Sequence, residues 1–197
     1  QTIDGLHPDT DYEIMLVRAN EASETVTFHT EPEPITLNVR DFGAFGDGAH
    51  DDTSAIQAAI LCCPKNARVL IPKGTYPVTA LFLKSDMILE LQENAVLAGI
   101  YDRARTPILP GHIEYDNEDG YYNLGSWEGN PIDSFASMIT GIHVKNVTIC
   151  GKGVLDGRAD FENWWSRTKD KIRAWRPIMI FLNHCENITV VGVTVQN

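Results

Sequence analysis

Two β-rich segments of this 197-residue chain contain the same three residues at the same spacing. The first segment contains His143, Asn146 and Gly151, and the second contains His184, Asn187 and Gly192, each 41 residues later. A fixed offset between strand-like segments indicates stacked structural repeats, each of which needs its neighbour to bury its apolar surface. Of all features of the sequence, this one restricts the fold most.

Short predicted strands, apolar at nearly every position, precede these two segments. They lie at residues 68–71, 74–78, 80–83, 87–91 and 95–97, and turns of Gly, Pro, Asn or Lys-Ser-Asp separate them. No tight hairpin signal such as Asn-Gly joins one run to the next. The pattern therefore predicts a parallel coil rather than an antiparallel meander.

A candidate capping helix lies ahead of the strands, over residues 53–63. Its apolar residues follow helical spacing, Asp51, Asp52 or Thr53 can cap its start, and Pro64 ends it. The end coil of a stack exposes apolar side chains and unpaired strand edges. We therefore expect this helix to cover the first coil.

The N-terminal segment is predicted to be a separate structural unit. Residues 1–30 alternate as strands do, and Gly5-Leu6-x-Pro8-x-Thr10-x-Tyr12 resembles the closing part of a fibronectin type III or related immunoglobulin-like sandwich. In the tyrosine corner of such folds the hydroxyl bonds to upstream backbone, so Tyr12 is expected to be structural. Residues 31–36, which begin Glu-Pro-Glu-Pro, are predicted to be a linker to a domain over 37–197.

Composition excludes several classes of protein. The chain is 43 % hydrophobic and 22 % charged, and no apolar run is long enough for a membrane span. A formal net charge of −11 with scattered basic residues argues against a nucleic-acid partner, but it does not exclude an anionic sugar. The four cysteines form no framework, so we expect reduced core thiols, with a bridge between Cys150 and Cys185 as the alternative.

A series of motifs runs in order through the chain. It comprises Asp41-Phe-Gly-Ala-x-Gly-Asp47-Gly, Asp51-Asp52-Thr-x-Ala-Ile-Gln57, Pro72-x-Gly74-x-Tyr76, Gly151-x-Gly153-x-Leu155-Asp156-Gly157, Trp164-Trp165, Arg176-Pro177 and Asn187-Ile-Thr. Together these motifs resemble the polygalacturonase family of glycoside hydrolases, which cleave α-1,4-linked galacturonic acid in pectin. The resemblance implies an all-β fold, a right-handed parallel β-helix of the pectin lyase-like type with an N-terminal capping helix.

The catalytic motifs implied by the resemblance are not found in this chain. Glycoside hydrolysis needs two carboxylates, and in polygalacturonases aspartates of Asn-Thr-Asp and Asp-Asp motifs, a Gly-His-Gly and an Arg-Ile-Lys all follow the position matched by Asn197. Asp51-Asp52 lies in the cap sequence, Ile113 follows Gly111-His112, and Lys171-Ile-Arg173 has the wrong order. We assign no catalytic residue, and we expect the chain to be incomplete at both ends.

Two features between Gly151 and His184 have a simpler structural interpretation. Asp156 could act as a general acid, but a turn that shapes the coil is the favoured reading. Trp164 and Trp165 could stack on sugar rings, but we expect them to pack from a helix-like segment at 161–175.

We expect no metal and no cofactor. Asp47, Asp51 and Asp52 lack the spacing of a Ca²⁺ loop, and His184-Cys185 has no second pair at zinc-ligand spacing. Two glycosylation-acceptor patterns, Asn146-Val-Thr and Asn187-Ile-Thr, lie on predicted turns, where modification is not the favoured reading.

Residues 100–135 interrupt the strand pattern with a long stretch rich in Tyr, Asp, Asn, Gly and Pro. Loops of this length in a compact domain are usually functional or disordered, and aromatic residues favour an ordered binding loop. We expect Tyr122, Trp127 and Glu128 to bind substrate and to restrict one end of its groove, as loops do in exo-acting polygalacturonases. Plain loop packing is the alternative.

The resemblance implies inverting, exo-acting hydrolysis of α-1,4-galacturonosidic bonds, with pectin, polygalacturonate or oligogalacturonides as partners. A pectate lyase-like enzyme, using Ca²⁺ and an Arg or Lys base, is one alternative. A non-catalytic adhesion or tailspike module is another. We expect neither a nucleic-acid nor a membrane partner. The sequence assigns no oligomeric state and no compartment: a secreted or periplasmic location is typical of the family, and a cytoplasmic one is the alternative.

The 197 residues alone should not hydrolyse polygalacturonate, because the implied acid and base are not among them. They should also be poorly soluble, because Ile188, Val190, Val191, Val193 and Val195 form an apolar stack in the last coil. Release of reducing ends from polygalacturonate measures the activity. Hydrolysis by the purified chain would contradict the assignment.

Overall fold

The computed structural model describes residues 3, 6–17, 24–32, 34–114 and 121–197. The chain divides into two compact units, residues 1–35 and 36–197, which are treated separately. No helix in the described ranges is long and apolar enough to cross a membrane.

The N-terminal unit contains an antiparallel pair of strands, β1 (Asp11–Leu16) and β2 (Glu24–His29). The hydroxyl of Tyr12 accepts a 2.7 Å hydrogen bond from the backbone N–H of His7, five residues upstream. The ring of Tyr12 also stacks on Phe28, with centroids 5.8 Å apart. Tyr12 therefore has the structural role that the sequence indicated.

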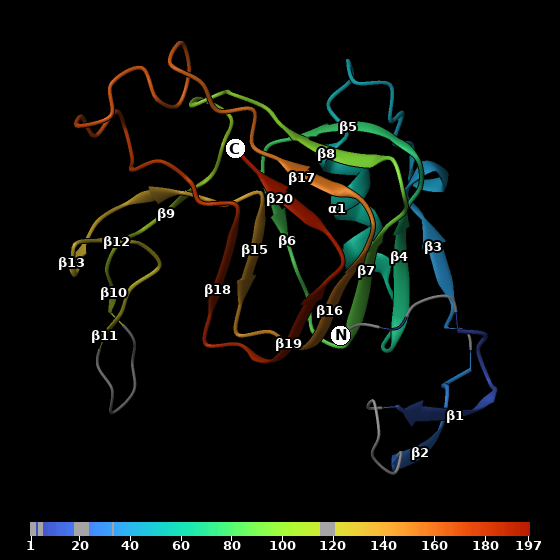
Figure 1. Ribbon diagram of the computed structural model, residues 1–197. Helices are drawn as coiled ribbons and strands as arrows, with labels where there is room; N and C mark the ends of the chain where they lie inside the picture. The colour runs from blue at the N-terminus through green and yellow to red at the C-terminus, as the bar shows by residue number, and fades with distance from the viewer. Residues whose placement is uncertain (1–2, 4–5, 18–23, 33, 115–120) are drawn as a thin grey trace. The chain divides into compact units, whose positions relative to one another are not determined.

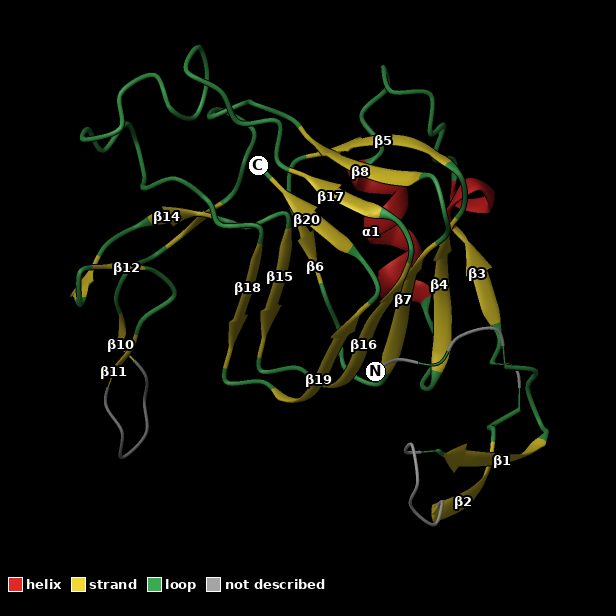
Figure 2. Ribbon diagram, in the orientation of Figure 1, coloured by secondary structure: helices red, strands yellow, loops and turns green. Residues whose placement is uncertain are grey.

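Residues 36–197 wind through three parallel sheets (Figure 1, Figure 2). The first sheet contains β3 (Thr36–Asn38), β4 (Ala67–Ile71), β7 (Met87–Leu91), β16 (Lys145–Gly151) and β19 (Glu186–Val191); the second contains β5 (Gly74–Val78), β8 (Ala95–Gly99), β17 (Val154–Asp156) and β20 (Thr194–Gln196); the third contains β6 (Leu81–Phe82), β15 (Ile139–Ile142) and β18 (Ile180–Asn183). A short 3₁₀ helix, η1 (Val39–Phe42), follows β3. Three turns of the chain, β4-β5-β6, β7-β8-β15 and β16-β17-β18, each contribute one strand to each sheet in the same order. The fold is therefore a parallel β-helix, and the predicted parallel coil is confirmed.

The lengths of successive coils show where the chain leaves this scaffold. In the first sheet Ala67 pairs with Met87, Met87 with Val147, and Val147 with Ile188. The coils therefore take 20 (87 − 67), 60 (147 − 87) and 41 (188 − 147) residues. The 41-residue offset in the sequence is thus one short coil plus an insertion, and not the repeat length of the scaffold.

Inward-pointing side chains stack on one another from coil to coil. Val69, Leu89 and Ile149 share one register position of the first sheet, and Tyr76, Leu97 and Leu155 share one of the second. All six are fully buried. Burial of each side chain contributes about 1.5–3 kcal/mol, and no coil could bury its own row without a neighbour.

Helix α1 (Thr53–Cys62) covers the first coil, as predicted. Its buried face of Ile56, Ala59 and Ile60 joins the core of the β-helix. The Gln57 amide bonds both backbone groups of Phe82: it donates to the carbonyl at 2.9 Å and accepts from the N–H at 2.7 Å. Phe82 lies in β6, one of the two edge strands of the third sheet, so Gln57 occupies backbone groups that could otherwise pair with another chain.

Asp51 and Asp52 have separate roles at the start of α1. The Asp51 carboxylate accepts hydrogen bonds from the backbone N–H and the hydroxyl of Thr53, as a cap does. The buried Asp52 carboxylate instead accepts from the backbone N–H groups of Phe45 at 2.7 Å and Gly46 at 3.0 Å. It therefore fixes the glycine-rich loop against the helix.

A column of left-handed residues marks the same turn in every coil. Asn66, Asp86, Asn146 and Asn187 have φ between 52° and 60°, a region that Asn and Asp tolerate best among residues other than Gly. The Asn146 amide donates to the Asp86 carboxylate at 2.7 Å, and the Asn187 amide donates to the Asn146 side-chain oxygen at 3.1 Å. Both asparagine nitrogens are thus engaged in a ladder, which supports their structural reading over glycosylation.

Residues 161–170 form a series of turns, so the predicted helix-like segment at 161–175 is wrong. The Asp160 carboxylate accepts from the backbone N–H groups of Glu162 and Asn163, and the Asn163 side chain accepts from the N–H of Asp160. Such side chains satisfy backbone donors locally and compete with helix formation.

All four cysteines are free thiols. Cys63 is buried, Cys150 and Cys185 are half-buried, and Cys62 is exposed, so the expectation of four core thiols is wrong for Cys62. Burial raises the pKa of the Cys63 and Cys150 thiols and makes both less reactive.

The Gly151→Ala substitution should destabilise the fold far more than Gly43→Ala. Both glycines have positive φ, 109° and 94°, but an added Cβ at Gly151 would lie 2.0 Å from the Leu91 carbonyl oxygen, whereas at Gly43 it would meet nothing within 4 Å. We expect a loss of about 1–2 kcal/mol at Gly43 from backbone strain alone and about 4 kcal/mol or more at Gly151. Urea unfolding measures both losses, and equal values would refute the importance of this close approach.

Candidate functional site

Both insertions leave the β-helix at the same corner, between the second and the third sheet. The first insertion, residues 100–138, joins β8 to β15, and the second insertion, residues 157–179, joins β17 to β18. The first insertion contains three small antiparallel pairs: β9 (Ile108–Leu109) with β14 (Ser134–Phe135), β10 (Ile113–Glu114) with β11 (Tyr121–Tyr122), and β12 (Ser126–Trp127) with β13 (Asn130–Pro131). Since they start from stacked coils at one corner, the insertions become neighbours in space.

Backbone hydrogen bonds join the two insertions. The N–H of Trp175 donates to the Asp133 carbonyl at 2.7 Å, and the N–H of Phe135 donates to the Trp175 carbonyl at 2.8 Å. Phe135, Trp164 and Ala174 form a small buried cluster beneath these bonds. The described parts of the insertions therefore make an ordered layer on the β-helix.

This layer covers the outer face of the third sheet. Phe82, Ile142 and Phe181, one from each strand of that sheet, pack against a cluster that includes Leu109 and Leu124 of the first insertion. Figure 1 shows β9 to β13 on the side of the third sheet where β18 lies. At this end of the β-helix the first insertion therefore occupies the outer surface that the sheet would otherwise present to a ligand.

The two adjacent tryptophans have different environments. Trp164 is 7 % exposed and packs edge-on against Phe135, with ring centroids 5.4 Å apart. The Arg103 guanidinium lies 4.7 Å from the centroid of its ring. Trp165 is 39 % exposed and is not part of the buried cluster of Phe135, Trp164 and Ala174. The packing reading fits Trp164, whereas Trp165 presents aromatic surface to solvent.

Three tryptophans and an arginine from separate segments converge at the surface. The Trp127 and Trp175 ring centroids are 4.8 Å apart, and the Arg176 guanidinium carbon lies 4.9 Å from the Trp175 centroid and 5.1 Å from that of Trp165. We call Trp127, Trp165, Trp175 and Arg176 the tryptophan–arginine cluster. Cation–π contacts of this kind hold a guanidinium in place, and because the rings are neutral they do not neutralise its positive charge.

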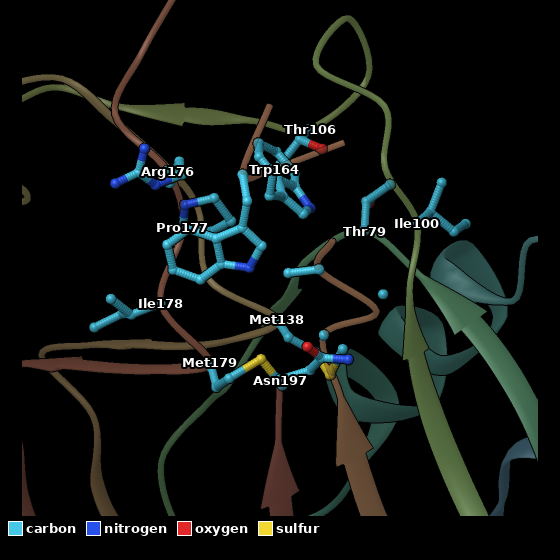
Figure 3. Close-up of a pocket in the computed structure, with 14 residues that line it drawn as sticks. Thr79, Ile100, Thr106, Met138, Trp164, Arg176, Pro177, Ile178, Met179 and Asn197 are labelled. Atoms are coloured by element: carbon cyan, nitrogen blue, oxygen red, sulfur yellow. The ribbon is translucent and has the colours of Figure 1, made fainter. Parts of the chain in front are cut away.

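A pocket of about 270 Å³ adjoins the cluster. Figure 3 shows Arg176 and Pro177 on one side, Thr79 and Ile100 on the other, and Trp164 above. Gly99, Gly157 and Met179, at the ends of the coils, also line it. A mostly apolar cavity with one cationic group at its rim suits a small anionic ligand that has an apolar face.

The predicted substrate-binding residues belong to two different hairpins of the first insertion. Trp127, 47 % exposed, lies in the cluster. Glu128 is exposed at the tip of the β12–β13 hairpin, where its φ of 49° gives it a part in the turn. The backbone of Tyr122 pairs with Ile113, but its side chain lies outside the described part of the structure, as does Tyr115.

The sequence pattern alone does not identify Trp175 and Arg176 as binding residues. Arg176 was recognised only as part of a family motif, and nothing local indicated that the rings of Trp127 and Trp165 would flank this pair. Six of the 16 basic residues, against three acidic ones, lie at 158–176, so the expectation of scattered basic residues is wrong here.

Asp156 has the turn role that the sequence favoured, because its carboxylate accepts from the backbone N–H of Arg158 at 2.9 Å. Backbone hydrogen bonds from His50 and Ala49, with a side-chain bond from His50, hold the pKa of Asp47 well below its usual range. Among the described residues, no three His, Cys, Asp or Glu side chains gather as a metal site would require.

Comparison with known proteins decides the family. Residues 36–172 match the model of the family described as rhamnogalacturonase A/epimerase, pectate lyase-like. The chain belongs to this family. Its fold is a right-handed parallel β-helix like that of the solved exopolygalacturonase from Yersinia enterocolitica, with a TM-score of 0.76 and 29 % identity over 99 % of this chain and 42 % of that one.

Curated relatives of this pectate lyase-like chain agree with the polygalacturonase resemblance. An exo-poly-alpha-D-galacturonosidase of Dickeya chrysanthemi is 36 % identical over 175 residues, which are 85 % of this chain and 27 % of the relative. The plasmin and fibronectin-binding protein A of Streptococcus pneumoniae is 48 % identical over 75 residues, 36 % of this chain and 10 % of that protein. The chain spans about a quarter of the length of the Dickeya relative.

Trp164→Ala should destabilise the fold far more than Trp165→Ala. Removal of the buried Trp164 ring should cost about 3–5 kcal/mol, whereas loss of the half-exposed Trp165 ring should cost about 1 kcal/mol or less. Urea unfolding followed by circular dichroism measures both. A large loss at Trp165 would mean that its ring is a core element.

Proposed function

We propose that this β-helix is part of a polygalacturonase-type glycoside hydrolase that cleaves α-1,4-galacturonosidic bonds of polygalacturonate. The names of the Dickeya and Yersinia relatives support this substrate and reaction. The scaffold, the family match and the locally basic second insertion are all consistent with a polyanionic sugar chain.

The proposal also includes exo action, that is, cleavage from one end of the polymer, and the position of the first insertion supports it. Its packing over Phe82, Ile142 and Phe181 occupies the outer face of the third sheet at one end. A polymer lying along that sheet could not pass this end, so it would enter with one chain terminus and lose units from there. Trp127, Glu128 and Tyr122, on the hairpins of the same insertion, are proposed to bind the substrate terminus.

An inverting reaction requires an acid and a base far enough apart to admit a water molecule between the base and the sugar. No carboxylate of this chain is assigned to either role, so the proposed acid and base are aspartates of the full-length protein. This chain would contribute the scaffold and one end of the groove.

The organisation of the chain is also proposed. Residues 1–30 would be the closing part of a fibronectin type III or immunoglobulin-like domain, and 31–36 a linker. The hydrogen bond from His7 to the Tyr12 hydroxyl supports the first assignment, because it has the geometry of a tyrosine corner.

Adhesion is the second candidate function. The short, 48 % identical match to the plasmin and fibronectin-binding protein A favours it, since a β-helix can serve as a binding stalk. The greater coverage of the exo-poly-alpha-D-galacturonosidase favours hydrolysis over adhesion.

Product analysis of the full-length protein on polygalacturonate tests the proposal. We expect saturated mono- or digalacturonate as the only early product, because the blocked groove accepts chain termini. Chromatography of early time points separates this from the mixed oligomers of internal cleavage. An unsaturated product absorbing in the ultraviolet would indicate a lyase, and no product would favour adhesion; either result would overturn the proposal.

A further inference from the structure

We propose that Arg176 is a specificity-determining residue that reads the carboxylate of a uronate unit, while Trp165 supports the apolar face of its ring. This inference rests on the proposed polyuronate substrate and names the residues that would distinguish an acidic sugar from a neutral one. It goes beyond the predicted binding loop, because both residues lie in the second insertion.

The environment of Arg176 leaves its charge uncompensated. Its Nη1 donates to the backbone carbonyl of Thr168 at 2.6 Å, and within the described ranges no carboxylate forms an ion pair with it. Arg167 of the same insertion, in contrast, donates from both Nε and Nη2 to Asp170 at 2.7 Å. A guanidinium has five N–H donors in a planar fork that matches a carboxylate, so Arg176 retains donors for a ligand.

The rings around Arg176 restrict how it can bind. The guanidinium carbon is about 5 Å from the centroids of both Trp165 and Trp175. Contacts with indole rings limit the rotamers of the arginine, so little side-chain entropy remains to be lost on binding. A pre-positioned fork favours bidentate hydrogen bonding to a flat anion.

The second insertion carries a positive formal charge. Residues 158–176 contain six basic and three acidic residues, a formal charge of +3 in a chain of −11. The first insertion, residues 100–138, contains two basic and seven acidic residues, so the second insertion is the more basic of the two. Arg167 and Lys171 of the second insertion pair with Asp170 and Asp133, whereas Arg176 forms no such pair within the described ranges.

The exposed rings define the remainder of the ligand. Trp165 is 39 % exposed and lines the pocket together with Arg176. Aromatic faces pack against the apolar C–H faces of pyranose rings. A uronate has both an apolar ring face and a carboxylate, so it can pack on Trp165 and bind Arg176 at once. A neutral hexose can pack on Trp165 but has no carboxylate for Arg176.

Binding of D-galacturonate and of its methyl ester to the full-length protein tests the inference. The two ligands share the ring, and only the acid carries a charge; neither contains a glycosidic bond to cleave. Arg176→Gln should weaken binding of the acid about tenfold or more and leave that of the ester within about twofold. Arg167→Gln, the matched control with the same loss of charge in the same insertion, should leave both unchanged. NMR titration measures the affinities, and circular dichroism confirms the fold of each variant.

Two further variants separate recognition from structure. Arg176→Lys keeps the charge without the fork, so it should restore part of the acid affinity if Arg176 contacts the carboxylate. Trp165→Ala should weaken the acid and the ester equally, and Trp165→Phe should restore both.

The inference fails if Arg176→Gln changes acid and ester affinity to the same extent, or changes neither. These binding measurements do not depend on turnover. A protein that binds galacturonate through Arg176 but releases no product would refute the proposed hydrolysis alone, and normal hydrolysis with no Arg176 effect on binding would refute the inference alone.

Discussion

In-register stacking of parallel coils is the constraint on which the rest of this structure depends. A coil buries its inward row of side chains, such as Val69, Leu89 and Ile149, only against the rows before and after it. Backbone must therefore approach backbone closely at each turn, and the position of Gly151 against the Leu91 carbonyl leaves no space for a side chain. Helix α1 ends the stack at the first coil by replacing a missing neighbour, with Gln57 bonded to the edge strand.

The same constraint explains where the candidate site lies. Sheet pairing fixes the strands but not the corner between the second and the third sheet, so extra residues are tolerated there. Both insertions leave from that corner, and stacking makes neighbours of segments more than 30 residues apart, such as Asp133 and Trp175. The tryptophan–arginine cluster and the covered face of the third sheet both result from this placement.

Much of the fold could be predicted from sequence because its determinants are local. Short apolar runs, left-handed Asn and Gly at turns, and the amphipathic pattern before Pro64 each specify a nearby conformation, and α1 and the strands lie close to their predicted bounds. The turns at 161–170 were not predicted. The side chains of Asp160 and Asn163 accept hydrogen bonds from nearby backbone N–H groups in place of helical hydrogen bonds, and this depends on side-chain geometry. The cluster was missed because Trp127 and Arg176 meet only through tertiary packing.

The asparagine ladder on the scaffold has a direction. The amide of Asn146 donates to Asp86 of the preceding coil and accepts from Asn187 of the following one. An ionised carboxylate can accept but cannot donate, and the Asn146 bond is the leading cause that lowers the pKa of Asp86. Aspartate therefore suits the first rung and no inner one. Both amides donate toward the preceding coil, so hydrogen bonding along this flank of the solenoid runs in one direction, and each bond can polarise the next.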